Sequence, residues 1–325
     1  MSYDKQKLQF ANVADINTDH YLVFPEVDTI IKDILQRDTI IRNRIQTRPE
    51  GTETFRWIEQ SAMATNAGFG DPRSIGTTVS TTPTRVEKLA KLKSIQNRIT
   101  YGLFDEELTK NGSFAYILEK DMKDAIGDML KLSNNAIWTG TDTSYGSPTT
   151  AQYFGILNAI TATGSISTGT IADAIKTKVA EMAARTDVTA YPTAVYMNPM
   201  TKNLMDQEEN AKTDKMKYYD VEVVPGTIVT GVMTCIGILP IITDNRIPVA
   251  KDAVETTKDA HKIVLLNEDM VVRHYLQGRD VSYANPVVFK LGTTQSLVTD
   301  YQMVMFDNVV VNYPDKAHCI LTKLV

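Results

Sequence analysis

The residues that could carry acid–base, nucleophilic or metal chemistry are scattered through the sequence. No two histidines have the spacing of a metal-ligand pair, and no His-Glu-x-x-His motif occurs. The histidines are His20, His261, His274 and His318. No Gly-x-Ser-x-Gly motif marks a nucleophilic serine either, since Asp142 stands two residues before Ser144. We therefore expect structural histidines and no metal site.

Three further segments begin like functional motifs but lack a required residue. Gly68-Phe69-Gly70 opens like a dinucleotide-binding turn, but Arg73 replaces the third glycine and no helix pattern follows. Residues 142–146 carry too few carboxylates for a calcium loop. The pairs Glu106-Glu107 and Glu208-Glu209 fit solvated helix faces better than an acid–base pair. The sequence predicts no catalytic residue and no cofactor, and therefore a protein that is not an enzyme.

The composition is that of an ordinary globular protein with a mild acidic excess. The 325 residues are 43% hydrophobic and 22% charged, and the formal net charge is −5. These values allow a sizeable core and provide no broad basic surface for nucleic acid. Cys235 and Cys319 lie in apolar, strand-like segments; a disulfide stays open, but buried free thiols fit a cytoplasmic protein better. No segment is typical of a signal peptide or a membrane helix.

Residues 1–49 combine an extended polar arm with a helix. Residues 1–24 show no period, whereas the apolar residues between Val27 and Leu35 recur at helical spacing. A basic, extended run then ends at Pro49. Its arginines are Arg37, Arg42, Arg44 and Arg48. Two interpretations carry equal weight: these side chains contact nucleic acid or carboxylates of a neighbouring subunit, or they form a solvated helix end favoured by the helix dipole.

Residues 50–101 have the pattern of one long β-hairpin. Residues 54–59 alternate in strand fashion, and residues 86–101 alternate weakly on the return. The intervening residues 68–83 are rich in Gly, Ser and Thr and cannot build a core. A loop of this length is unusual in a compact domain and is typically functional or flexible.

Residues 113–138 carry the strongest helical signal in the chain. Ser113 is a candidate N-cap and Gly140 a candidate stop, which gives a helix of roughly 25 residues and nearly 40 Å. Its predicted core residues are Phe114, Leu118, Met122 and Met129. The same apolar stripe includes Leu132.

The second half of the chain mixes helices and strands. The pattern predicts a helix over residues 171–184, a buried strand over 194–197 and a helix opened by Pro199. Strands follow over 221–224, 228–242, 263–266 and 271–275, and again in the alternating tail from 303. The fold class is therefore α+β.

The order and spacing of these segments resembles the major capsid proteins of tailed bacteriophages, with the Hong Kong 97-type fold. The resemblance rests on several segments, each weak alone and specific in their order. They are Asn135-Ala136-Ile137-Trp138-Thr139-Gly140, Phe154-Gly155-Ile156-Leu157-Asn158, Ala194-Val195-Tyr196-Met197-Asn198-Pro199, Met305-Phe306-Asp307-Asn308-Val309 and Lys316-Ala317-His318. The resemblance covers nearly the whole chain.

This resemblance implies a domain organisation. Residues 1–49 would form the N-terminal arm and helix, and residues 50–101 the extended loop. Residues 102–160 and 287–325 would form the peripheral domain with its long spine helix. Residues 161–286 would form the axial domain.

The resemblance also implies a function. The chain would be the major head protein of a virion, assembling itself as pentamers and hexamers into an icosahedral shell around double-stranded DNA, without sequence-specific binding. Assembly would occur in the host bacterial cytoplasm with a separate scaffolding protein, a portal protein and, where present, decoration proteins. The inter-subunit contacts would include the loop-tip residues Phe69, Asp71, Arg73 and Ile75. The segment before Pro25 is too short for a fused scaffolding region, so we expect the chain to enter the shell uncut.

Two other functions stay open at this point. An encapsulin has the same fold but encloses a cargo enzyme, so the contents of the particle would decide. An α+β enzyme with its site in the Gly/Thr loops would instead be a small oligomer with a perturbed titratable cluster.

Overall fold

The computed structural model describes residues 40–62, 83–102, 115–148, 152–186, 190–212, 219–224, 227–252, 254, 256–293 and 298–325. These residues belong to two compact units. The smaller unit contains residues 96–130 and 286–304. The larger unit contains residues 39–95, 131–285 and 305–325.

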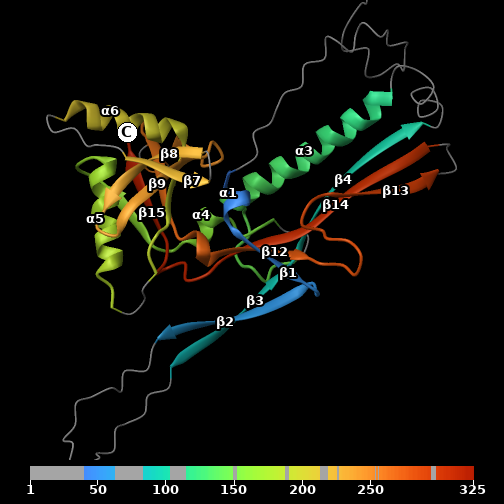
Figure 1. Cartoon of the computed structure of the whole chain (residues 1–325), viewed down its shortest axis with the longest axis horizontal. Helices are drawn as coiled ribbons and strands as arrows, with labels where there is room; N and C mark the ends of the chain where they lie inside the picture. The colour runs from blue at the N-terminus through green and yellow to red at the C-terminus, as the bar shows by residue number, and fades with distance from the viewer. Residues whose placement is uncertain are drawn as a thin grey trace, which may run out of the picture. The chain divides into compact units, whose positions relative to one another are not determined.

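An eight-stranded mixed sheet forms much of the larger unit (Figure 1). Its strand order is β5-β15-β11-β6-β9-β8-β7, with β10 paired to β11. Its strands are β5 (Thr163–Ile166), β6 (Ala194–Met197), β7 (Tyr219–Val224), β8 (Thr227–Thr234), β9 (Gly237–Thr243), β10 (Ala250–Lys251), β11 (Asp259–Leu266) and β15 (Cys319–Leu324). The pairs β6–β9 and β5–β15 are parallel, so the sheet is mixed.

Two capped helices pack on this sheet. The helix α5 (Ile171–Ala183) begins after Thr170, whose side chain accepts a hydrogen bond from the Asp173 N–H. The helix α6 (Pro199–Ala211) begins after Asn198, which caps the Met200 N–H. Their inward residues join the strands in one hydrophobic core that includes Ile175, Val179, Met182, Met205, Val195, Ile241, Ile263 and Leu321. The helix predicted over 171–184, the buried strand 194–197 and the helix opened by Pro199 are confirmed.

A second sheet is built around the long strand β14 (Val298–Val311). The order is β1 (Gln46–Glu50), β12 (Val271–Leu276), β14 and β13 (Val287–Thr293), and β4 (Lys93–Gly102) also pairs with β14. Residues 307–311 of β14 pair with β12, and residues 299–304 pair with β13. The short elements are α1 (Ile40–Arg44), α4 (Ile156–Ala159) and η2 (Glu268–Met270). The extended run predicted to end at Pro49 is β1.

The strands β2 (Thr54–Ala62) and β3 (Thr84–Lys91) form a separate antiparallel hairpin (Figure 1). This hairpin is shorter than the predicted range of 50–101. The next strand, β4, leaves it and pairs with β14. Lys93 and Ile95 of β4 are buried there, so the change of partner gives the strand a packed face that the hairpin could not provide.

The predicted long helix is α3 (Ala115–Thr139). Met129 is buried and Met122 is half-buried, while Phe114 and the side chain of Leu118 lie outside the described residues. The prediction that Leu132 is buried is wrong, because its side chain is 50% exposed. The inward position is taken instead by Ser133, which is fully buried and hydrogen-bonds to Arg42. A polar partner on another element therefore overrides the apolar stripe at this turn.

Two glycines allow the chain to double back after α3. The Gly155 N–H donates to the Gly140 carbonyl at 3.2 Å, and the Asn158 side-chain amide donates to the same oxygen at 2.6 Å. A Cβ on Gly155 would lie 2.4 Å from the Gly140 nitrogen and 2.8 Å from the Trp138 oxygen. Both contacts are with backbone, which cannot move aside, so this close approach requires glycine.

The two cysteines differ from each other in exposure. Both are free, so no disulfide joins them. Cys319 is buried in β15 as predicted, but Cys235 is exposed in the turn between β8 and β9. The prediction of burial is wrong for Cys235, because the apolar segment around it folds into two strands joined at that residue. Within the described part of the chain, no helix is long and apolar enough to span a membrane.

His318 lies where two of the segments that connect the sheets meet. One runs from β11 to β12, and the other, which contains His318, runs from β14 to β15. Its Nδ1 accepts from the Asn267 N–H at 3.1 Å, and its Nε2 lies 3.1 Å from the Asn312 carbonyl oxygen. A backbone N–H can only donate and a carbonyl can only accept, so the imidazole is neutral with its proton on Nε2. Burial lowers the pKa of His318 to about 4, and the bond to Asn312 opposes only part of that shift.

We expect Gly155→Ala to lower the unfolding free energy by several kcal/mol, because two backbone groups occupy the space that the methyl needs. Gly127→Ala is the matched control. Its Cβ meets nothing within 4 Å in the middle of α3, so it should stabilise the chain by about 0.5–1 kcal/mol. Urea denaturation measures both, and equal effects would contradict the proposed close approach.

We expect acid to weaken the folded state through His318. The unfolded histidine takes up a proton near pH 6.5, whereas the folded one does so near pH 4. The contribution of neutral His318 to the unfolding free energy is therefore complete above about pH 6.5. It falls by about 3 kcal/mol as the pH drops to 4. His318→Gln can keep both hydrogen bonds without titrating, so its unfolding free energy should fall less over this range. An identical pH dependence in the variant would exclude His318 as the cause.

Candidate assembly site

The predicted contact residues are the arginines of the N-terminal arm and helix and the residues of the loop tip. Arg37 and the loop-tip residues Phe69, Asp71, Arg73 and Ile75 lie outside the described residues, so their contacts stay predictions. The base of the hairpin that carries this tip is described. It shows how the hairpin is held and which of its faces is left open.

The inner face of the hairpin is anchored through aromatic residues. Phe55 of β2 is buried and stacks on the His274 ring at 4.1 Å between centroids. Trp57, two residues further along β2, meets the Tyr145 ring edge-on at 5.9 Å. Phe55 also packs with Leu92 and with residues of β3 and β14 in a small hydrophobic core. The base of the hairpin is therefore fixed to two other parts of the larger unit.

A buried carboxylate on the same face is fully engaged. Glu59 accepts a hydrogen bond from the Trp57 indole N–H at 3.0 Å and an ion pair from Lys88 at 2.6 Å. Trp57 and Lys88 face each other in the β2–β3 register. The carboxylate thus ties both strands together and holds the indole against Tyr145.

The Gly/Ser/Thr loop after α3 braces the hairpin. The Lys91 N–H donates to the Tyr145 carbonyl at 3.0 Å. Lys93 is buried and donates to Asp142 at 3.0 Å and to the Pro148 carbonyl at 2.7 Å. Burial opposes ionisation of Asp142, but hydrogen bonds from Ser147 and Lys93 outweigh it and lower the pKa of Asp142. The loop after α3 therefore supports the end of the hairpin and the start of β4.

The outer face of the hairpin is less covered among the described residues. Ile58 is 67% exposed, and Leu89 is 38% exposed with its side chain beside Gly146. Arg56 and Glu87, paired at 3.0 Å, lie on the same face and are both mostly exposed. The exposed Ile58 is the apolar part of this face, and the Arg56–Glu87 pair is its charged part.

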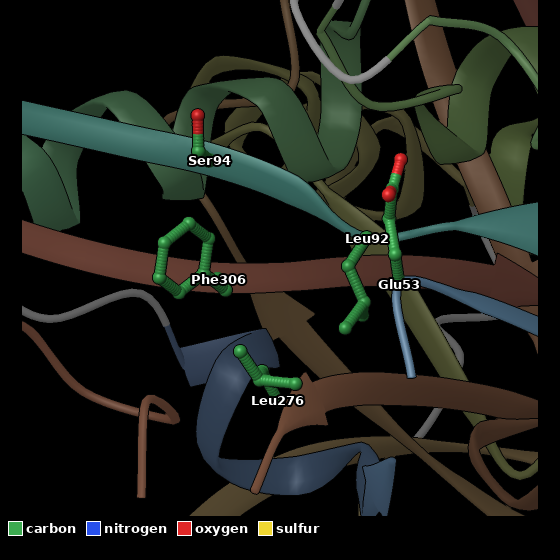
Figure 2. Close-up of a pocket in the computed structure, with 5 residues that line it drawn as sticks. All are labelled: Glu53, Leu92, Ser94, Leu276 and Phe306. Carbon is green, nitrogen blue, oxygen red and sulfur yellow. The ribbon is translucent and has the colours of Figure 1, made fainter. Parts of the chain in front are cut away.

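A hollow of about 320 Å³ lies beside the hairpin base. Figure 2 shows Leu92, Leu276 and Phe306 around its apolar side, with the carboxylate of Glu53 and the hydroxyl of Ser94 pointing away from Leu276. Among the described residues that line the hollow, Glu53 and Ser94 are the polar ones. In the described part of the chain, no group of three or more His, Cys, Asp or Glu side chains could hold a metal ion.

A buried ionic cluster joins β14, β12, α1 and α3 in the larger unit. Asp307 of β14 accepts from Arg273 Nε at 2.9 Å and from the Tyr153 hydroxyl, and Arg42 approaches it to 3.9 Å. Arg42 also donates to Ser133 of α3 and to the Ala284 carbonyl, each at 2.8 Å. Burial and the nearby Asp307 charge raise the pKa of Tyr153, which therefore stays protonated as a donor.

Of the three predicted contact arginines that the structure describes, only Arg48 is exposed enough to fit either of the two interpretations, with 69% of its side chain exposed. Arg42 is buried, and Arg44 forms two hydrogen bonds to Glu268, at 2.5 and 2.7 Å. Both side chains therefore have partners within the chain. Sequence patterns suggested neither arrangement, because the partners lie more than 90 residues away.

Comparison with known proteins shows what this architecture is similar to. No family model matches the chain, and no curated protein matches it in sequence. The capsid of the empty GTA particle is 14% identical with a TM-score of 0.61, covering 97% of this chain and 99% of that chain. Microbacterium phage Oxtober96 gives 13% identity and a TM-score of 0.60, covering 93% and 96%.

The third similar structure is the holo-SrpI encapsulin complex from Synechococcus elongatus. It is 14% identical with a TM-score of 0.59, covering 93% of this chain and 95% of that chain. The chain has the Hong Kong 97-type capsid fold. The fold resemblance read from the order of segments is confirmed. The division of this capsid fold into arm, extended loop, peripheral and axial domains stays a prediction.

Replacing Asp307 tests how much the ionic cluster contributes to the unfolding free energy. Asp307→Asn leaves the buried Arg273 and Arg42 without their carboxylate partner, and we expect a loss of about 3–5 kcal/mol in unfolding free energy. The control is Asp280→Asn, since Asp280 is exposed and should change stability by less than about 0.5 kcal/mol. Urea denaturation measures both variants. Similar small losses would show that the cluster does not hold these elements together.

Proposed function

We propose that this chain is the major capsid protein of a tailed bacteriophage and acts by assembling with copies of itself. The observation that carries the proposal is structural similarity to shell proteins over at least 93% of the chain. The anchored hairpin with an open outer face supports it. A two-stranded ribbon is marginal alone and gains stability when a neighbour covers it. The shell would contain pentamers and hexamers and would be part of the virion.

The proposal assigns the chain no catalytic role. Three of the buried ionisable side chains, Asp307, Lys93 and Glu59, have hydrogen-bond or ion-pair partners that account for their burial. The shell would enclose double-stranded DNA without reading its sequence, consistent with the net charge of −5. A separate scaffolding protein, a portal protein and decoration proteins are the partners that such a shell would use in the host cytoplasm.

A shell of the encapsulin type is the second candidate, and one observation favours it. The encapsulin structure matches the chain with nearly the same TM-score as the phage and GTA capsids, 0.59 against 0.60 and 0.61. The fold therefore supports both kinds of container equally. Their difference lies in the cargo.

Purified full-length protein should form closed shells or ring-shaped capsomers, visible by negative-stain electron microscopy and by size-exclusion chromatography. Each subunit should bury well over the roughly 1,600 Å² of a standard interface. A compact monomer at every concentration would refute the proposal.

Nuclease-treated particles from infected or native cells then distinguish the two containers. Protected double-stranded DNA would support the phage capsid. An enclosed protein without DNA would support the encapsulin.

A further inference from the structure

Tyr313 occupies an unusual backbone conformation in the turn between β14 and β15. Among the described residues other than glycine, it alone has a positive φ, of 51°. A side chain with a Cβ adopts this left-handed region at a cost, and glycine or asparagine is the usual choice. The turn closes on Tyr313, whose carbonyl accepts from the Lys316 and Ala317 N–H groups at 3.1 and 3.0 Å. The turn itself therefore gives no reason for tyrosine.

The Tyr313 side chain provides that reason. Its hydroxyl accepts a hydrogen bond from the Gln60 N–H of β2 at 3.3 Å. The pairing of β2 with β3 shifts register between Gln60 and Ala62, so the bond falls at a β-bulge. A bulge leaves a residue out of the ladder and bends its strand. The hydroxyl thus supports the hairpin at the point where its direction is set.

This contact is the outermost of three anchors along β2. Phe55 is held by His274 of β12, and Trp57 by Tyr145 of the loop after α3. Gln60 is held by the turn that carries Tyr313. Because the three anchors lie on three different parts of the larger unit, they fix the strand in more than one direction.

We propose that Tyr313 is a positioning residue that sets the direction of the β2–β3 hairpin relative to the rest of the larger unit. The strained backbone aims the hydroxyl at the bulge, and a relaxed glycine turn would supply no acceptor there. The inference that Tyr313 holds the hairpin at the bulge rests on the contacts alone. Its consequence for assembly rests on the proposed shell function, since a misdirected hairpin would present its outer face wrongly to a neighbouring subunit.

The test uses two variants of the full chain. Tyr313→Phe removes only the hydroxyl, and Tyr313→Gly also relieves the backbone strain. Tyr191→Phe is the control, because Tyr191 is exposed in the loop before β6. Hydrogen exchange of the β2 amides reports on the hairpin directly, unfolding by urea reports on global stability, and electron microscopy reports on shell yield.

In Tyr313→Phe we expect the Gln60 amide and its neighbours to exchange about three- to tenfold faster, as for one lost hydrogen bond, with global stability nearly unchanged. Tyr313→Gly should show the same local effect, and both variants should give fewer or misshapen shells. Exchange rates equal to those of wild type and Tyr191→Phe would overturn the structural inference. Faster exchange with normal shells would overturn its role in assembly. Wild-type protein that forms no shells would refute the proposed function, while the exchange comparison would still decide the contact.

Discussion

The buried carboxylate of Asp307 is the constraint on which the larger unit depends. An unpaired charge in a dry interior costs several kcal/mol, so the folded chain must bring donors to it from elsewhere. Arg273 comes from β12, Tyr153 from the segment between Gly140 and Gly155, and Arg42 from α1. Arg42 in turn binds Ser133 of α3. One carboxylate thus fixes the mutual positions of elements that are distant in sequence, and any slip of one element would leave a buried charge unmatched.

The hairpin depends on this frame because it has little core of its own. Its small hydrophobic cluster uses Phe55 and Ala90 from the two strands and borrows Val310 from β14 and Leu276 from β12. The strand β14 that supplies Val310 also carries Asp307, and the strand β12 carries both Arg273 and His274. Displacement of these two strands would therefore disturb the ionic cluster and the hairpin anchors together. The exposed apolar and charged side chains of the hairpin are thus carried on a base that is held by buried contacts.

A shell protein needs this combination of a rigid base and an open face. Heterologous contacts between identical subunits close into rings and lattices only when each subunit presents its surfaces at a constant angle. The similarity to capsid and encapsulin structures at 12–14% identity shows that such an architecture tolerates almost complete replacement of side chains. In this chain the base of the hairpin is held by its own particular contacts, among them Glu59 with Lys88, Lys93 with Asp142 and the hydroxyl of Tyr313 with the Gln60 N–H.

The sequence by itself determined the elements and their order. Periodicity located α3, α5 and α6, and alternation located most strands. These patterns show which residues of a segment face the core, and each segment contains its own pattern. The order of segments was enough to suggest the fold. Only the tertiary structure decided that Arg42 and Arg44 serve the interior, that Leu132 is exposed while Ser133 is buried, and that β4 leaves the hairpin. The positions of Arg42, Arg44 and Ser133 depend on partners far away in sequence, as Ser133 is for Arg42 and Glu268 is for Arg44, and no local pattern encodes the approach of two such distant side chains.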